Sequence, residues 1–262
     1  MRAEVIKQHR NSFHSYGVYF TLLIWPIVVF FNAYYSYKPF NLSQGPWNTF
    51  ASQEDIIMFL ITGFLGYISF KSLLQSAFYM GHERINGTLE TIFLTPANRI
   101  AIIYGRAFGA LIENIWMFSV FCVFVTVWIR RIPVESLIYI PISFIVLIVS
   151  AAVWGGLMNV IFLFSRDASF LMAVFDEPMI LFSGVRMPTF VFPIWAKIIS
   201  ALFPLTYALM IVRPLLIEGS LSASLQGIYK LLISLLLIVS LTLWLLKKAE
   251  KNARKNGNFV FY

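Results

Sequence analysis

The sequence has few charged residues, one cysteine and three histidines, and these scarcities exclude several classes of protein. Only 12% of its 262 residues are Asp, Glu, Lys or Arg, about half of the roughly 25% typical of soluble domains. Cys122 alone cannot form an intrachain disulfide framework, and His9, His14 and His82 are not grouped as metal ligands. The sequence contains no G-x-x-x-x-G-K-[ST] loop, which excludes P-loop binding of ATP. It also has no nucleophile and base at a recognisable spacing. We therefore expect no catalytic residue, no metal and no cofactor bound by this chain itself.

Apolar residues are abundant instead, at 59% of the chain, with a mean hydropathy of +0.78. Such a chain needs hydrocarbon as a solvent, and a transmembrane helix needs about 20 apolar residues. The sequence predicts an all-α integral membrane protein with one transmembrane domain, 1–246, and a basic, partly disordered tail, 247–262. Six spans can be placed, at about residues 16–36, 56–80, 100–128, 137–164, 169–188 and 223–246. A cleaved signal peptide is the alternative for the first span, but its apolar run is longer than usual and lacks Ala-x-Ala-like cleavage chemistry.

The distribution of Lys and Arg predicts the orientation of the protein in the membrane. With six spans, both termini lie on the same side. The segments assigned to that side, both termini and Arg106 included, carry twelve Lys and Arg residues, and those assigned to the other side carry six. Because cytoplasmic loops carry the excess of positive charge, we expect a multi-pass protein of a prokaryotic plasma membrane with both termini in the cytoplasm.

A charged cytoplasmic segment, GHERINGTLETIFLTP, separates the second and third spans. After a break at Gly87, the apolar residues Leu89 and Phe93 recur with the spacing of one helix face. A helix this short is unstable alone in water, so it needs a partner surface, either lipid headgroups or a groove on another protein. Glu83 and Glu90 argue against anionic headgroups and favour the protein groove.

A second unusual segment follows the fifth span, where five of the eleven prolines fall between residues 178 and 214. Proline removes a backbone donor and disfavours a continuous helix, and bare backbone at membrane depth must pack within protein or line a wet cavity. We expect two re-entrant half-helices at about 190–213, on the outer side. A kinked seventh span, which would place the C-terminus outside, is the alternative.

These two segments resemble parts of the ABC-2 type transporter permeases, the transmembrane subunits of ABC exporters. ERINGTLETIFLTPANRIAIIYGR is similar to the E-R-x-x-G-T-L-E run of that family, and LFSGVRMPTFVFPIWAKIISALFPLTYALMIVR to its F-S-G-x-x-x-P block. The resemblance implies that the first segment is a coupling helix seated in a cleft of a separate ATPase, with contacts from Glu83, Arg84, Gly87, Thr88, Leu89, Glu90, Phe93 and Pro96. It implies that the second segment roofs the translocation path, through Ser183, Gly184, Pro188, Pro193, Pro204 and Thr206.

The resemblance also implies a function and a set of partners. Two permease subunits would pair in the lipid bilayer, as a homodimer or a heterodimer, and each would dock an ABC ATPase that carries ATP and Mg. The chain would not be an enzyme alone, and no nucleic acid is implied. The N-terminus lacks the pattern typical of polysaccharide exporters, which favours a hydrophobic or amphipathic small molecule, lipid or peptide as the substrate. The alternatives are a permease for a lipid-linked polysaccharide, a non-transporting membrane scaffold and an intramembrane enzyme.

Asp176 and Glu177 fall inside the predicted fifth span, where the family is typically apolar. An acidic residue at the centre of a span costs about 2.5–3.5 kcal/mol on insertion scales. The pair can line a cavity and contact a polar or cationic substrate, form an internal ion pair with Lys71 or Arg213, or lie closer to the interface than the predicted span suggests. Together with Glu113 in the third span, Asp176 and Glu177 are the candidate residues of the translocation path.

Overall fold

The computed structural model describes residues 6, 10, 16–37, 53–85, 87, 98–129, 134–165 and 167–256. Within these residues the protein contains helices and no strand, so the expected all-α fold is confirmed for the part of the chain described. The helices are α2 Tyr16–Tyr37, α3 Gln53–Ile85, α5 Arg99–Ile129, α6 Val134–Phe164, α7 Ala168–Phe182, α8 Ile194–Leu202, α9 Pro204–Arg213 and α10 Leu221–Asn256, with a 3-10 turn at Thr189–Val191 and a π turn at Pro214–Glu218.

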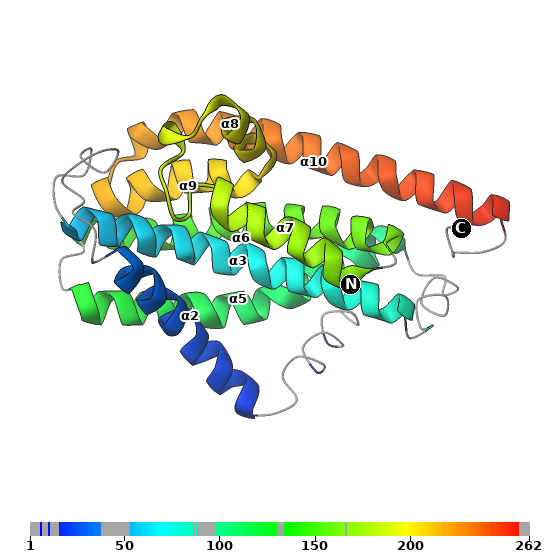
Figure 1. The fold of residues 1–262 in the computed structure, drawn as a ribbon, viewed down its shortest axis with the longest axis horizontal. Helices are drawn as coiled ribbons and strands as arrows, with labels where there is room; N and C mark the ends of the chain where they lie inside the picture. The colour runs from blue at the N-terminus through cyan, green and yellow to red at the C-terminus, as the bar shows by residue number, and fades with distance from the viewer. Residues whose placement is uncertain are drawn as a thin grey trace.

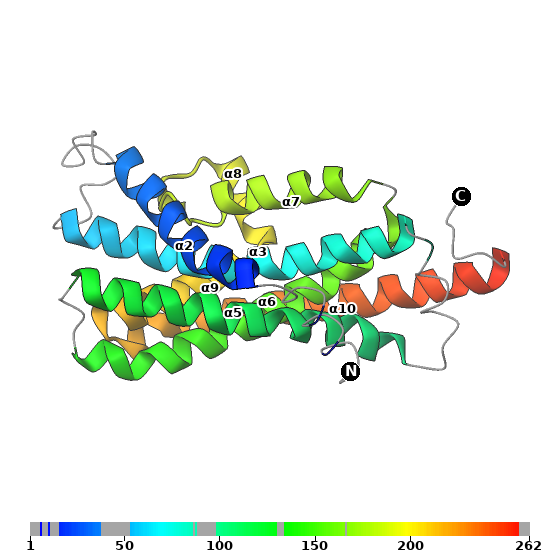
Figure 2. The ribbon, with the colours of Figure 1, turned by 90° about the horizontal axis from the view of Figure 1, so that it is seen from below.

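The helices form a bundle organised around α3, which contacts α2, α5, α6, α7 and α9. The C-terminal ends of α3, α6 and α10 lie at the same end of the bundle as the N-terminal ends of α5 and α7, on the right in Figure 1. The bent pair α8 and α9 lies toward the opposite end, beside the C-terminal end of α7 (Figures 1 and 2). The long helices therefore alternate in direction, as the expected order of loops requires.

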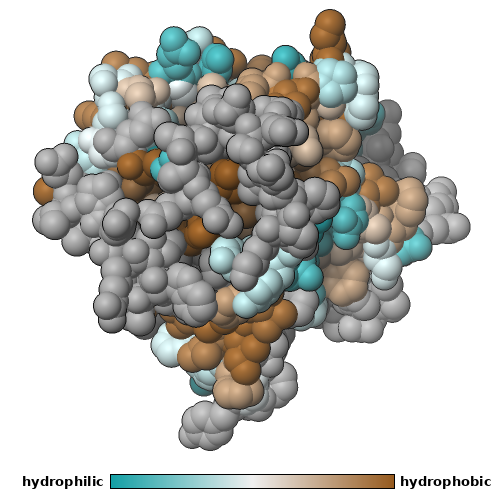
Figure 3. Space-filling model, turned by 60° about the vertical axis from the view of Figure 1, so that its left-hand side comes forward, coloured by the Kyte–Doolittle hydropathy of each residue, from teal (hydrophilic) through white to brown (hydrophobic). Residues whose placement is uncertain are grey.

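Four described helices are long and apolar enough to cross a membrane, or up to five if the bent pair α8 and α9 is one span. These four segments are Asp55–Gly81, Ile100–Val120, Ile138–Leu163 and Leu221–Lys248. They coincide with the predicted second, third, fourth and sixth spans, and α2 coincides in extent with the predicted first span. Figure 3 shows apolar side chains over much of the surface that is not drawn in grey, as hydrocarbon contact requires.

The predicted fifth span is too long. Helix α7 has 15 residues and ends at Phe182, whereas the predicted span continues to residue 188. The helix ends because Ser183 caps it and Gly184 takes a left-handed φ of 82°, which redirects the chain. An α-helix of this length rises about 22 Å, less than the roughly 30 Å of hydrocarbon in a bilayer. The count of six spans therefore stays a prediction.

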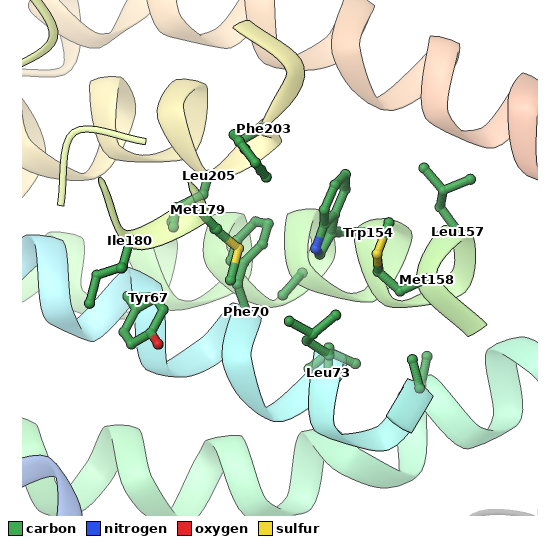
Figure 4. Close-up of a cluster of buried hydrophobic side chains, with 14 of the residues drawn as sticks. Tyr67, Phe70, Leu73, Trp154, Leu157, Met158, Met179, Ile180, Phe203 and Leu205 are labelled. Atoms are coloured by element: carbon green, nitrogen blue, oxygen red, sulfur yellow. The ribbon is translucent and has the colours of Figure 1, made fainter. Parts of the chain in front are cut away.

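The main hydrophobic core joins α3, α6, α7 and the α8–α9 bend. Figure 4 shows Phe70 and Leu73 of α3 on the side of the cluster opposite Trp154 of α6. Met179 of α7 and Phe203 of the bend belong to the same cluster. Small residues allow the helices to approach closely. A Cβ added at Gly155 would lie 2.9 Å from the Leu73 side chain, and one at Gly156 would lie 2.6 Å from the Tyr104 ring, which is the small-residue packing typical of membrane helices.

The last helix continues beyond the predicted end of the final span. Helix α10 has 36 residues and includes residues 247–256 of the expected basic tail. Lys, Ala, Glu and Arg all have high helix propensity, so this part of the tail extends the helix. The Lys248 ammonium lies 5.1 Å from the centre of the Trp244 ring, and this aromatic–cation pair marks the level where the helix leaves the hydrocarbon.

Candidate functional site: a polar cluster between α3 and α7

Three polar side chains meet between α3 and α7 at membrane depth. The Lys71 Nζ lies 3.0 Å from Asp176 Oδ2, and the Tyr67 hydroxyl donates to Asp176 Oδ1 at 2.8 Å. The Lys71 ammonium also donates to the Tyr67 hydroxyl oxygen at 3.2 Å. Tyr67 and Lys71 are four residues apart, so one face of α3 presents both to the same carboxylate.

Of the alternatives for the acidic pair, the internal ion pair with Lys71 is present. The side chains of Lys71 and Asp176 are 31% and 13% exposed, so the pair lies at the margin of the packed bundle. Glu177 is exposed, on a different side of α7. Successive residues point about 100° apart around an α-helix, and the two carboxylates therefore face different sides of α7.

Arg213, the other candidate partner, makes different contacts. Its Nη2 donates to the Gly184 carbonyl at 2.6 Å and to the Phe59 carbonyl at 3.3 Å, and its guanidinium carbon lies 3.5 Å from the centre of the Phe59 ring. The close approach depends on Gly63, where an added Cβ would overlap the Val185 carbonyl oxygen and lie 3.0 Å from Arg213 Nη2. The guanidinium therefore joins α3, α9 and the bend after α7.

The residues expected to form a roof lie in and around this bend and the α8–α9 pair. Ser183, Pro188, Pro204 and Thr206 are buried, and Pro193 is exposed at the start of α8. The axes of α8 and of the segment that begins at Pro204 differ by 92°. The Thr206 hydroxyl donates to the Ser200 carbonyl at 2.7 Å, so a side chain of α9 holds the last turn of α8 across the bend.

The expected coupling segment is described only at its start. Glu83 and Arg84 lie in the last turns of α3, and Gly87 follows with a φ of 71° and open space around the position of a Cβ. Thr88, Leu89, Glu90, Phe93 and Pro96 lie outside the described residues. Glu113 belongs to α5, and its side chain also lies outside the described part of the chain.

Polar contacts that sequence reasoning missed join α3 to α5. The Asn114 side-chain amide donates to Ser72 Oγ at 2.6 Å and to the Ser69 carbonyl at 3.2 Å. Polar residues spaced by three within a span signal such a contact. Arg106, counted with the cytoplasmic cations, lies two turns inside α5 and is only 3% exposed. Among the described residues, no group of three or more His, Cys, Asp or Glu could hold a metal ion.

Comparison with known proteins connects this architecture to transport. No family model matches the chain. The chain is 25% identical over 193 residues to a protein of Cyanophora paradoxa named "Putative transport permease ycf38". The match covers 73% of this chain and 63% of the relative, so the chain spans less than two thirds of the length of that protein. An all-helical membrane bundle with this similarity is consistent with the resemblance to transporter permeases found in the sequence.

Proposed function

We propose that this chain is the transmembrane permease subunit of an ATP-driven ABC exporter of the ABC-2 type. The similarity to a named transport permease over 73% of the chain is the observation that carries the proposal. The alternating helices of the bundle and their apolar surface support it. In this proposal the chain forms the substrate path, pairs with a second permease subunit and receives energy from an ABC ATPase that holds ATP and Mg.

The proposed coupling region is residues 83–96. Helix α3 extends past its apolar segment, which ends at Gly81, and carries Glu83 and Arg84 in its last turns. The left-handed Gly87 then turns the chain immediately after the helix. Such a turn would place the following short helix across the end of the bundle, where the apolar face with Leu89 and Phe93 needs a partner surface.

The proposed substrate is a hydrophobic or amphipathic small molecule, lipid or peptide. The proposed location is a plasma membrane, with both termini in the cytoplasm. The relative comes from a plastid-bearing eukaryote, so a prokaryotic origin stays a prediction. An intramembrane enzyme is disfavoured, because Asp176 is ion-paired with Lys71, and an ion-paired carboxylate is a poor general acid.

Co-purification with a partner ATPase tests the proposal directly. The chain is purified from its native membrane in mild detergent, and its partners are identified by mass spectrometry. We expect a stoichiometric ABC ATPase. Leu89→Asp should reduce its recovery at least about tenfold, because an unpaired charge in a hydrophobic cleft costs more than 1.4 kcal/mol.

Thr91→Asp is the matched control, because it adds the same charge two positions along the predicted helix, on the side away from Leu89. This variant should retain the ATPase. Recovery of no ATPase with the unmodified chain, or full recovery with Leu89→Asp, would contradict the proposal.

A further inference from the structure

A groove of about 410 Å³ lies between α6, α10 and the α8–α9 bend, and Phe175 of α7 also contributes to its lining. Its volume lies within the roughly 300–1,000 Å³ typical of ligand sites. The two long walls follow helical spacing, with Trp154, Leu157, Met158 and Ile161 on α6 and Lys230, Ile233, Ser234, Leu237, Ile238 and Leu241 on α10. Figure 4 shows Trp154 and Leu157 on the upper side of α6, toward α10.

Lys230 is the only charged residue among those that line the groove. Its side chain is half-buried, and it has no hydrogen bond or ion pair with any residue that the structure describes. A Lys at membrane depth is costly unless it pairs or reaches the interface. The rest of the lining supplies no carboxylate, so within the groove the charge of Lys230 is available to an anionic ligand.

Lys230 lies in the first half of the candidate span of α10, Leu221–Lys248, nine residues from its beginning. Tyr229, the preceding residue, is 53% exposed. Trp244, with Lys248 over its ring, lies near the other end of the span, as interfacial aromatics do. A Lys inside a span keeps its charged end in a polar environment by extending its long side chain toward the interface. The Lys230 ammonium can therefore reach from inside the span toward the headgroups of the leaflet near the beginning of α10.

The apolar part of the groove has the length of one leaflet. The lining residues of α10 extend from Lys230 to Leu241, a separation of 11 positions that rises about 16 Å. Half of the hydrocarbon core of a bilayer is about 15 Å. The groove thus begins at a cation that can reach toward the headgroups and continues as an apolar channel deeper into the membrane.

Helix α10 is also the candidate span most exposed to lipid. Only 22% of its most apolar window is buried inside the protein, against 83% for α3 and 61% for α6. A lipid diffusing in the bilayer can therefore enter the groove from the side.

We propose that this groove binds an anionic membrane lipid, with its phosphate at Lys230 and one acyl chain between α6 and α10. The cation selects the charge of the headgroup, and the apolar walls accept the chain. Ser234, one turn from Lys230 on the same face, offers a hydroxyl to the same headgroup. The site is independent of the proposed coupling region and needs no ATPase.

A second groove on the same helix provides an internal comparison. It is lined by residues of α6, α10 and the segment after α9, has a volume of about 270 Å³, and contains no charged residue among its lining. Leu232 lines this second groove and Leu237 lines the first, and both are well exposed, at 55% and 66%. These two leucines make a matched pair for substitution.

The test uses the full chain in nanodiscs that contain equal amounts of phosphatidylglycerol and phosphatidylcholine, with native mass spectrometry of the retained lipid. One interfacial Lys attracts anionic lipid by an amount that corresponds to about a fivefold preference. We therefore expect about fivefold more phosphatidylglycerol than phosphatidylcholine on the unmodified chain. Lys230→Gln should remove the preference and Lys230→Arg should keep it. Lys197→Gln, which removes an exposed cation of α8 that does not line the groove, should also keep it.

Leu237→Trp should fill the groove and lower the amount of retained phosphatidylglycerol, whereas Leu232→Trp should not. Circular dichroism and size-exclusion chromatography show whether each variant is folded. Equal retention of the two lipids by the unmodified chain would overturn the proposal. So would an unchanged preference in folded Lys230→Gln, or equal losses in the two Trp variants.

Discussion

Replacing Lys71 by Met should reveal how strongly the ion pair between α3 and α7 stabilises the bundle. The Lys71 ammonium lies 3.0 Å from the Asp176 carboxylate, and the substitution would leave that carboxylate with only the Tyr67 hydroxyl. Removing one partner of a fully buried pair costs about 3–5 kcal/mol. Because the Lys71 side chain is 31% exposed and the Tyr67 bond remains, we expect a loss of about 2 kcal/mol in the free energy of unfolding.

A double-mutant cycle separates the pair from the two individual side chains. Lys71→Met, Asp176→Leu and the double variant are compared by equilibrium unfolding in mixed micelles, followed by circular dichroism. The double variant buries no unpaired charge, so it should be more stable than the sum of the single losses predicts, by about 1–2 kcal/mol. Lys197→Met, which removes an exposed lysine of α8, should change the free energy of unfolding by less than about 0.5 kcal/mol.

The reasoning fails if Lys71→Met costs no more than this control, or if the two single losses are additive. The same variants distinguish a structural pair from a substrate contact. If the pair only stabilises the bundle, the double variant should keep the substrate-stimulated ATPase activity of the proposed complex. If Asp176 contacts a cationic substrate, the double variant should lose that activity although it is folded.

Two further substitutions, Gly63→Ala and Thr206→Val, test the packing around Arg213 and the α8–α9 bend, and each has a control. Gly63→Ala should destabilise the protein by about 1–3 kcal/mol, because the new Cβ would overlap the Val185 carbonyl oxygen. Gly87→Ala is the control, because a Cβ added at that position has open space around it. It should lower the free energy of unfolding only by the strain of Ala in a left-handed conformation, about 1–2 kcal/mol. The amides of the α8–α9 bend should keep their protection from hydrogen exchange in this variant. Thr206→Val should cost about 1 kcal/mol in the free energy of unfolding, because it removes the donor to the Ser200 carbonyl. Ser240→Ala, which removes an exposed hydroxyl bonded within its own helix, should cost less, and an equal loss in these two variants would contradict the proposed role of Thr206.

The positions of the helices were predictable from the sequence because long apolar runs decide them. Four predicted spans coincide with long apolar helices. Their ends differ from the ends of those helices mainly because the helices continue beyond the apolar run. The exception is α7, where the local conformation of Ser183 and Gly184 ends the helix inside an apolar run. Hydropathy does not encode that turn.

The contacts of the polar side chains were less predictable, because they depend on how each helix is rotated and packed. Tyr67 and Asp176 are 109 positions apart, and no local pattern relates them. Arg213 was considered as an ion-pair partner of the acidic pair, yet its guanidinium is held against carbonyl groups of α3 and the bend. Only the absence of a side chain at Gly63 gives it room there, and that depends on tertiary structure.

The unbroken length of α3 has a mechanical consequence. Its 33 residues correspond to a rod of about 50 Å. Near one end, the Phe59 carbonyl accepts a hydrogen bond from Arg213, whose guanidinium also donates to the Gly184 carbonyl, and the other end leads directly to Gly87. A displacement of that second end would be carried along a continuous helix, and it would reach the bend and α9 through the packed core that they share with α3 and through the Arg213 hydrogen bonds.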